Sequence, residues 1–229
     1  MEPLARIRGL RLLYFKESTD DAAIRHLPPI HPLREFYAHR SPITDTALEP
    51  LSRMKKLQVL TFWGTQVTGE GTEHLQKNRE LRILDISEAP ITTKGLESIA
   101  KLTQLDYLRL NRTPIEDDWL PALHDMPNLR SLILDDTHIT DAGVPTLARF
   151  KQLRTLSLYG TKITDESADT LKGMTHLKYL NLSETRISPE FVEEIRKALP
   201  DTDVHPRKPE EGEEWGPMSP LGNEAPAEK

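Results

Sequence analysis

The sequence is organised around a leucine that recurs every 24 residues. It occupies Leu33, Leu57, Leu81, Leu105, Leu129, Leu153 and Leu177 without an insertion, and Leu10 lies 23 residues before the first of them. A fixed period of roughly 20 to 50 residues is typical of stacked repeats, in which each unit packs only on its neighbours and the stack shares one continuous core. The eight units therefore predict an elongated α/β repeat domain.

Each unit combines a short strand with a short helix. Counted from the leucine as position zero, positions three and five are apolar in all eight units, although only 37% of the chain is hydrophobic. This alternation with period two is typical of a strand. Farther along, apolar residues about three positions apart, such as Ala168, Leu171 and Met174, predict a helix. Hydroxyl residues at position eight are expected to bond loop backbone, and those at position eleven to cap the helix.

The units resemble a known repeat family. LRSLILDDTHITDAGVPTLARFKQ and LRTLSLYGTKITDESADTLKGMTH resemble leucine-rich repeats of the 24-residue, Thr-containing bacterial type. ITDAGVPTLARF also resembles the repeats of F-box-type ubiquitin-ligase receptors. The resemblance covers about residues 4 to 204. It implies a leucine-rich-repeat solenoid, a right-handed curved coil with a concave parallel sheet and convex short helices, which usually serves as a protein-binding surface.

The repeat domain is predicted to span residues 1–204, with a disordered tail over 205–229. Leu4 and Ile7 match helix positions of a half unit, which is expected to cap the first end. A last helix around Phe191 and a partial strand over 199–204 are expected to cover the other end. Residues 206–229 contain five Pro, six Glu and few apolar residues. The segment can therefore bury too little apolar surface to offset the entropy lost on ordering, which predicts disorder. The tail also holds an isolated aromatic residue, Trp215, which is a candidate docking motif.

Two local departures from the repeat lie on the helix side. Thr72 and Asn78 replace apolar helix residues in the third unit, and Gly69 and Gly71 lie beside them in the sequence. This combination predicts a loosely packed turn. Trp119 occupies a position that is Ala, Gly or Ser in five other units, with Phe191 as the other bulky exception. We expect its ring to lie over its own helix turn, with a second contact surface as the alternative.

Large rings gather on the concave side of the first three units. Side chains between the buried strand positions form rows across the sheet, because neighbouring strands lie about 4.8 Å apart. These rows bring together Tyr14, Tyr37, His39 and Trp63. Rigid aromatic side chains are frequent anchors of protein interfaces. The competing interpretation is that the rings stack on one another and stiffen the sheet.

The middle of the same surface is charged. Asp85 and Arg109 are neighbours in position four, and Glu88, Arg112 and Asp136 alternate in position seven. We expect lateral ion pairs, each contributing about 0–1 kcal/mol. In a second interpretation Arg109, flanked by Tyr107 and Asn111, binds a carboxylate of the partner.

Several function classes are disfavoured. The chain has no Cys, which excludes disulfides, thiolate zinc sites and Cys nucleophiles. No nucleophile, base and orienting group are placed together, and catalysis would require a perturbed pKa at His39 with a carboxylate beside it. The net charge of -6 argues against general nucleic-acid binding. No apolar run is long enough for a membrane-spanning helix.

The sequence thus predicts a monomeric, cytoplasmic, non-enzymatic scaffold without metal or cofactor, whose partner is a protein or peptide and not a nucleic acid or membrane. Tyr14, Tyr37 and Trp63 would be buried against the partner, while Asp85, Arg109 and Asn111 would set its orientation. Besides an enzyme, which would need the His39 environment described above, two alternatives remain open. One is the substrate-recognition subunit of a ubiquitin-ligase-like complex, which needs an adaptor-binding module that this sequence does not show. The other is a carbohydrate-binding module, because stacked Tyr and Trp rings also suit sugar faces.

Overall fold

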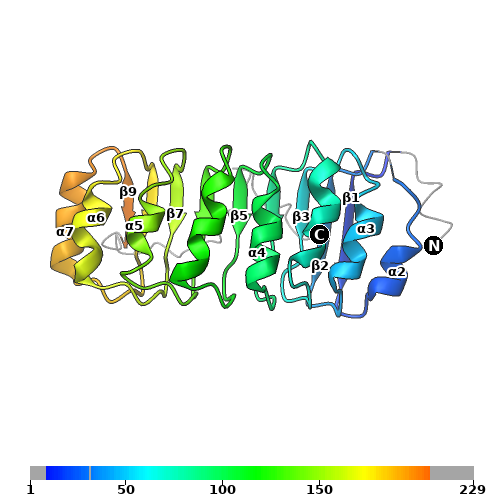
Figure 1. Cartoon of the computed structure of the whole chain (residues 1–229), viewed down its shortest axis with the longest axis horizontal. Coiled ribbons are helices and arrows are strands. Elements are labelled where there is room, and N and C mark those ends of the chain that lie inside the picture. The colour runs from blue at the N-terminus through cyan, green and yellow to red at the C-terminus, as the bar shows by residue number, and fades with distance from the viewer. Residues whose placement is uncertain (1–8, 31, 207–229) are drawn as a thin grey trace, which may run out of the picture.

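Each repeat contributes one strand to a single sheet in the computed structural model, which describes residues 9–30 and 32–206. Within this part of the chain, nine strands follow one another in sequence order, and every neighbouring pair is parallel. They are β1 (Leu12–Lys16), β2 (Glu35–His39), β3 (Val59–Thr61), β4 (Ile83–Asp85), β5 (Tyr107–Arg109), β6 (Ser131–Ile133), β7 (Thr155–Ser157), β8 (Tyr179–Asn181) and β9 (Asp203–His205). The molecule is consequently elongated across its strands (Figure 1).

Short α-helices and 3-10 helices (η) cover one face of the sheet (Figure 1). We call the other face, which the helices do not cover, the sheet face. The helices are α2 (Asp21–Arg25), η1 (Asp45–Ala47), α3 (Leu48–Leu51), η2 (Glu70–Lys77), α4 (Thr93–Ala100), η3 (Asp117–Asp125), α5 (Val144–Leu147), η4 (Asp165–Ser167), α6 (Ala168–Lys172) and α7 (Pro189–Ala198). Packed helices need about 8–10 Å each, whereas strands need about 4.8 Å, so the sheet forms the concave side. The predicted α/β solenoid is confirmed.

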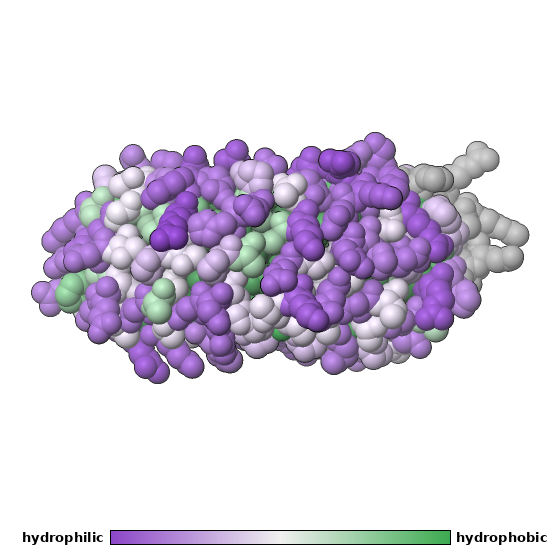
Figure 2. Space-filling model, in the orientation of Figure 1, coloured by the Kyte–Doolittle hydropathy of each residue, from purple (hydrophilic) through white to green (hydrophobic). Residues whose placement is uncertain are grey.

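The core is a ladder of equivalent apolar residues. The sheet register pairs Leu60 with Leu84 and Leu84 with Leu108, and all three are fully buried. Burying one leucine contributes about 1.5–3 kcal/mol, and the same contact recurs from unit to unit. Only at the N-terminal strand does the burial weaken, since Phe15 is partly exposed. The helix face outside this core is largely hydrophilic (Figure 2).

Threonine hydroxyl groups at position eight form hydrogen bonds with backbone carbonyl groups of the loop, as predicted. Thr65 Oγ1 donates to the Phe62 carbonyl at 2.9 Å, and Thr113, Thr137, Thr161 and Thr185 make the equivalent bond three residues back. At position eleven, Thr44, Thr92 and Thr164 cap their helices by accepting a backbone N–H bond.

The residue at position seven of each unit, one to three residues after the end of the strand, has a left-handed backbone. These are Glu17 (φ 23°), Arg40 (47°), Gly64 (67°), Glu88 (54°), Arg112 (52°), Asp136 (54°), Gly160 (64°) and Glu184 (57°). The left-handed region costs a residue with a Cβ roughly 1–2 kcal/mol. The turn therefore recurs because the stacked loops require it, and it aims the position-seven side chain in the same way in each unit.

The prediction of a loose third unit is wrong. Thr72 and Asn78 are fully buried. Thr72 Oγ1 donates to the Gly69 carbonyl at 2.7 Å, and Asn78 Nδ2 donates to the Met54 carbonyl at 3.0 Å. A Cβ added to Gly95 of the next unit would lie 1.9 Å from the Thr68 carbonyl oxygen. Here the glycines permit a close approach of two coils instead of opening the turn.

The C-terminal end of the repeat stack is covered by α7 and β9. β9 pairs with β8 and includes His205, one residue of the segment predicted as tail. Trp119 is partly buried and packs against the core. Leu4, Ile7 and the tail from residue 207 onward, with Trp215, lie outside the described residues.

Candidate functional site

The predicted rings are in contact with one another on the sheet face. We call Tyr14, Tyr37, His39 and Trp63 the aromatic cluster. The His39 ring is central, with centroid distances of 4.9 Å to Tyr14, 6.1 Å to Tyr37 and 5.5 Å to Trp63, all near-perpendicular. Tyr14 Oη and His39 Nδ1 lie 2.8 Å apart in a hydrogen bond. Perpendicular ring pairs of this kind stabilise by about 0.5–1.5 kcal/mol each.

Charged side chains border the aromatic cluster. The Arg40 guanidinium lies 4.6 Å from the Trp63 ring centroid, and Lys16 Nζ lies 5.6 Å from that of Tyr14. Tyr37 Oη donates to Glu35 at 2.8 Å. Tyr14 is 44% exposed, whereas the other three rings are half-buried. The rings do contact one another, mainly edge to face, and Tyr14 nevertheless presents a large free surface.

Burial keeps the aromatic cluster uncharged. It raises the pKa of Tyr37, and the hydrogen bond to the Glu35 carboxylate raises it further. Burial lowers the pKa of His39, and the positive charge of Lys16 acts in the same direction, while the negative charge of Asp85 opposes both. At neutral pH the centre of the cluster is therefore a neutral imidazole.

Opposite shifts at His39 are expected from two charge-removing substitutions. Asp85→Asn should lower the pKa of His39, because it removes the negative charge that raises it, and Lys16→Gln should raise that pKa. Chemical shifts of the His39 ring followed by NMR during a pH titration measure both. Shifts in the same direction would contradict the assigned electrostatics.

The charged middle of the sheet face pairs laterally, as predicted. Arg109 Nη1 lies 3.9 Å from Asp85 Oδ2, and the guanidinium lies 5.6 Å from the Tyr107 ring centroid. Asn111 Nδ2 donates to Asp135 Oδ2 at 3.1 Å. Arg109 Nε is buried and has no hydrogen-bond partner among the described residues. The long ion pair and this unpaired N–H leave Arg109 with unused donor capacity.

The predicted position-seven ion pairs are also formed. Arg112 donates to Glu88 at 2.7 Å and to Asp136 at 3.1 Å. Because the Arg112 side chain is 63% exposed, water screens these pairs and they contribute little to stability.

Part of the predicted surface is covered. Thr61, Ile133 and Ser157 of position four and Ser87 of position six are buried, although these positions were expected to project from the sheet. Thr61, Ser87 and Ser157 are short and lie in rows between longer side chains, which shield them; Thr61, for example, lies between Tyr37 and Asp85.

Sequence reasoning did not single out Asp135. This carboxylate accepts bonds from Ser157 Oγ and from the backbone N–H of Tyr159, in addition to its bond with Asn111. Burial raises the pKa of Asp135, against these hydrogen bonds. Its place beside Asn111 in position six was a readable signal, and it supports the orientation of Asn111.

The arrangement around His39 does not build a catalytic site. The hydrogen bond of its ring goes to a tyrosine hydroxyl, whereas Asp85 accepts from Ser87 Oγ and is not bonded to the imidazole. Within residues 9–30 and 32–206, no group of three or more His, Asp or Glu side chains is placed to hold a metal ion. No helix in the same part of the chain is long and apolar enough to cross a membrane.

Comparisons with known proteins agree with the repeat architecture. One leucine-rich repeat family model matches residues 127–187, and another matches residues 77–100. No curated protein matches the chain. An internalin (InlF) from Listeria monocytogenes is 20% identical with a TM-score of 0.48, covering 76% of this chain and 60% of its own. A leucine-rich repeat protein from Leptospira interrogans is 19% identical with a TM-score of 0.44, covering 76% and 54%.

This chain thus spans 60% and 54% of the lengths of those two solved structures. The family matches fall on units whose strands, β4 and β6 to β8, lie in the regular register of the sheet. Residues 77–100 and 127–187 thus match leucine-rich repeats, and the regular register of the sheet extends the same repeat architecture across the described residues.

Proposed function

We propose that this protein is a non-catalytic scaffold that binds a protein or peptide partner on its sheet face, with the aromatic cluster as the anchor. Leucine-rich repeat domains generally bind proteins. The observation that carries the proposal is the 44% exposure of Tyr14 within a group of contacting rings. The proposal includes a monomeric state and a cytoplasmic, bacterial setting.

Preorganisation makes the aromatic cluster an efficient anchor. Ordering flexible side chains on binding costs about 0.5–1.5 kcal/mol each. The rings around His39 are already held by three ring contacts and by the Tyr14 hydrogen bond. A partner that covers Tyr14 therefore gains apolar burial at a small cost in entropy.

The charged middle of the sheet face supplies orientation. Asp85, Tyr107, Arg109 and Asn111 lie on β4, β5 and the residues that follow them. A carboxylate of the partner would form a charge-assisted bond with the partly exposed Arg109 guanidinium, whose ion pair with Asp85 is long at 3.9 Å, and such bonds are about twice as strong as neutral ones.

The same geometry favours protein over carbohydrate. A sugar binds by stacking on the face of an exposed ring, but Arg40 lies 4.6 Å from the Trp63 centroid and His39 meets Trp63 edge-on. A sugar would have to displace that cation, whereas a peptide can use the arginine as a further contact.

The proposal is tested by capture from native lysate with the purified full chain and variants of it. Partner retention should fall at least about tenfold with Tyr14→Ala and with Tyr37→Ala/Trp63→Ala, since truncating an interface anchor removes 1.4 kcal/mol or more. Tyr159→Ala is the matched control, because Tyr159 is a 37% exposed ring of the sheet at the other end.

Circular dichroism establishes that each variant is folded. Equal retention by Tyr14→Ala and Tyr159→Ala would mean that the rings only stiffen the sheet. Loss with Tyr159→Ala alone would move the binding site toward β7.

A further inference from the structure

The two long edges of the solenoid carry opposite charge. The strand-start edge consists of the segments that lead into strands β3 to β9: 52–58, 76–82, 100–106, 124–130, 148–154, 172–178 and 196–202. They contain 15 Lys or Arg and four Asp or Glu. The strand-end edge consists of the segments after β2 to β8: 40–46, 64–70, 88–94, 112–118, 136–142, 160–166 and 184–190. These segments contain five Lys or Arg and 12 Asp or Glu.

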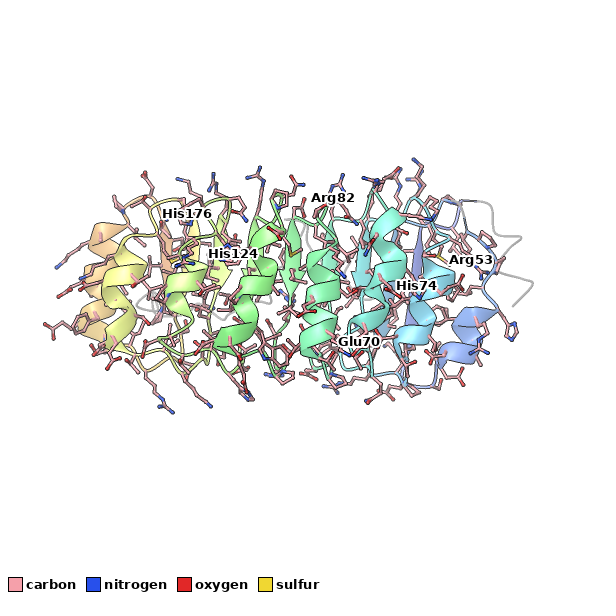
Figure 3. The ribbon with its side chains drawn as sticks, in the orientation of Figure 1. Arg53, Glu70, His74, Arg82, His124 and His176 are labelled. Carbon is pink, nitrogen blue, oxygen red and sulfur yellow. The ribbon has the colours of Figure 1, made fainter. Side chains whose placement is uncertain are left out.

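Side chains on the two edges point away from each other. Figure 3 shows Arg82 and His176 toward one long edge and Glu70 toward the other. Although the net charge is only -6, positive and negative side chains are therefore separated onto the two long edges of the molecule. Potentials of one sign along a surface steer partners of the opposite sign and select against partners of the same sign.

Five cations near the C-terminal end of the strand-start edge form what we call the basic cluster. They are Arg130, Arg149, Lys151, Arg154 and Lys178. The Arg154 N–H donates to the Arg130 carbonyl and the Lys178 N–H donates to the Arg154 carbonyl, both at 2.7 Å. Three successive coils thus present adjacent cations.

No carboxylate in the described part of the chain forms an ion pair with the basic cluster. Other cations of the same edge, such as Lys77 and Arg82, also lack an ion pair in that part of the chain, whereas Lys172 pairs with Asp169 and Glu194. What distinguishes the basic cluster is that two successive segments of the edge, 148–154 and 172–178, contain no Asp or Glu.

Arg154 is held in place without being neutralised. Its Nη1 donates to the carbonyls of Lys151 at 3.2 Å, Leu153 at 2.9 Å and His176 at 3.1 Å. Carbonyl oxygens orient a guanidinium but carry no formal charge. The positive field reaches His176, whose pKa is lowered by burial and then by the charges of Lys151 and Arg154.

We propose that the basic cluster binds a short acidic peptide segment of a protein partner, at a surface separate from the aromatic cluster. Three strands span about 10 Å, which an extended peptide covers with three or four residues. Two or three carboxylates of such a segment can reach Arg130, Arg154 and Lys178 together.

The charge pattern favours a peptide over a nucleic acid. The residues directly after the repeat leucines, at position one, form a row along this edge, and in that row Asp106 lies between Arg82 and Arg130. The acidic residue interrupts the basic surface, which is therefore too short to follow a long phosphate backbone. The strand-end edge, with its excess of carboxylates, repels any polyanion that extends across the molecule. A segment of a few residues avoids both features.

Fluorescence anisotropy with a labelled hexaglutamate peptide and the full chain tests the proposal. Arg149→Gln/Lys151→Gln/Lys178→Gln removes three exposed charges from the basic cluster and should weaken binding at least about tenfold. Lys94→Gln/Lys162→Gln/Arg186→Gln removes three charges from the strand-end edge and should leave binding within about twofold. Tyr14→Ala should also bind normally, which separates this site from the sheet-face site.

Four results would overturn the proposal. Equal weakening by both triple variants, or no binding by the wild type, would mean that no local site exists. Tighter binding of a single-stranded oligonucleotide with the same number of charges would assign the edge to nucleic acid. Binding gained at least about tenfold by Glu210→Gln/Glu211→Gln/Glu213→Gln/Glu214→Gln would assign the cluster to the chain's own acidic segment.

Discussion

Gly95→Ala is expected to lower the free energy of unfolding by about 2–3 kcal/mol, because overpacking against fixed backbone is costly. The expected sign is opposite to helix propensity, which favours Ala over Gly by about 1 kcal/mol inside a helix such as α4. The new Cβ would lie 1.9 Å from the Thr68 carbonyl oxygen and 3.1 Å from Gly69 Cα. Both contacts are to backbone, so no side-chain rotation relieves them.

The coil can relieve this overlap only by moving apart from its neighbour. That movement would weaken the bond between the Thr92 N–H and the Thr68 carbonyl, 3.1 Å long, which joins the third and fourth units. Urea unfolding followed by circular dichroism measures the loss. Glu97→Ala is the control, since Glu97 is an exposed residue of α4 and its change should stay within about 0.5 kcal/mol. A stabilised Gly95→Ala variant would show that the two coils are not tightly packed.

The strands, the core and the neighbours in each row could be predicted because the repeat has no insertion. Once Leu60 and Leu84 occupy equivalent positions, the parallel register places Tyr14 beside Tyr37 and Asp85 beside Arg109. In a solenoid, each repeat contacts only its neighbours, so residues one repeat apart in the sequence lie side by side in the structure. Aligning the repeats therefore shows which residues are in contact. Reading position one in the same way would also have revealed Arg130, Arg154 and Lys178.

Features that depend on backbone shape could not be predicted. Only two of the residues with a left-handed backbone after a strand are Gly, so residues such as Arg112 and Glu184 gave no signal. Gly95 resembles any small residue in sequence, and its role follows from the path of the preceding coil. The burial of Ser157 depends on the heights of its row neighbours, which residue type alone does not give.

Acidic residues at the start of the helices have a role beyond their own helix. Carboxylates are generally favourable at a helix N-terminus, but several of these also join successive units. Asp21, Asp45, Asp117 and Asp141 each accept from the backbone N–H and the hydroxyl of the threonine 23 residues later, Thr44, Thr68, Thr140 and Thr164. We call each such pair an Asp–Thr clamp. Thr93 replaces the Asp in the fourth unit, and Glu116 replaces the Thr of the fifth, so both partners of that clamp are missing.

Asp141→Ala is expected to destabilise the fold by about 2–3 kcal/mol at pH 7, because it leaves the Thr164 N–H and two hydroxyl groups without a charged acceptor. Asp141 accepts from Thr164 N at 2.8 Å, from Thr164 Oγ1 at 2.8 Å and from Ser167 Oγ. Asp169→Ala is the matched control, since its side chain is 94% exposed and its loss should cost less than about 0.5 kcal/mol. Equal costs for the two substitutions would contradict a clamp between units.

The clamp also predicts a stability loss in acid. Burial raises the pKa of Asp141, but the hydrogen bonds from Ser167 and Thr164 outweigh it, so the pKa is lowered overall, as it is for Asp21. A lowered folded-state pKa contributes stability that is complete above the unfolded-state value of about 3.9 and is lost as the pH falls through the folded-state value. The difference in stability between wild type and Asp141→Ala should therefore shrink below about pH 4. Urea unfolding of both proteins from pH 7 down to pH 2.5 measures it, and a constant difference would show that the carboxylate charge does not join the units.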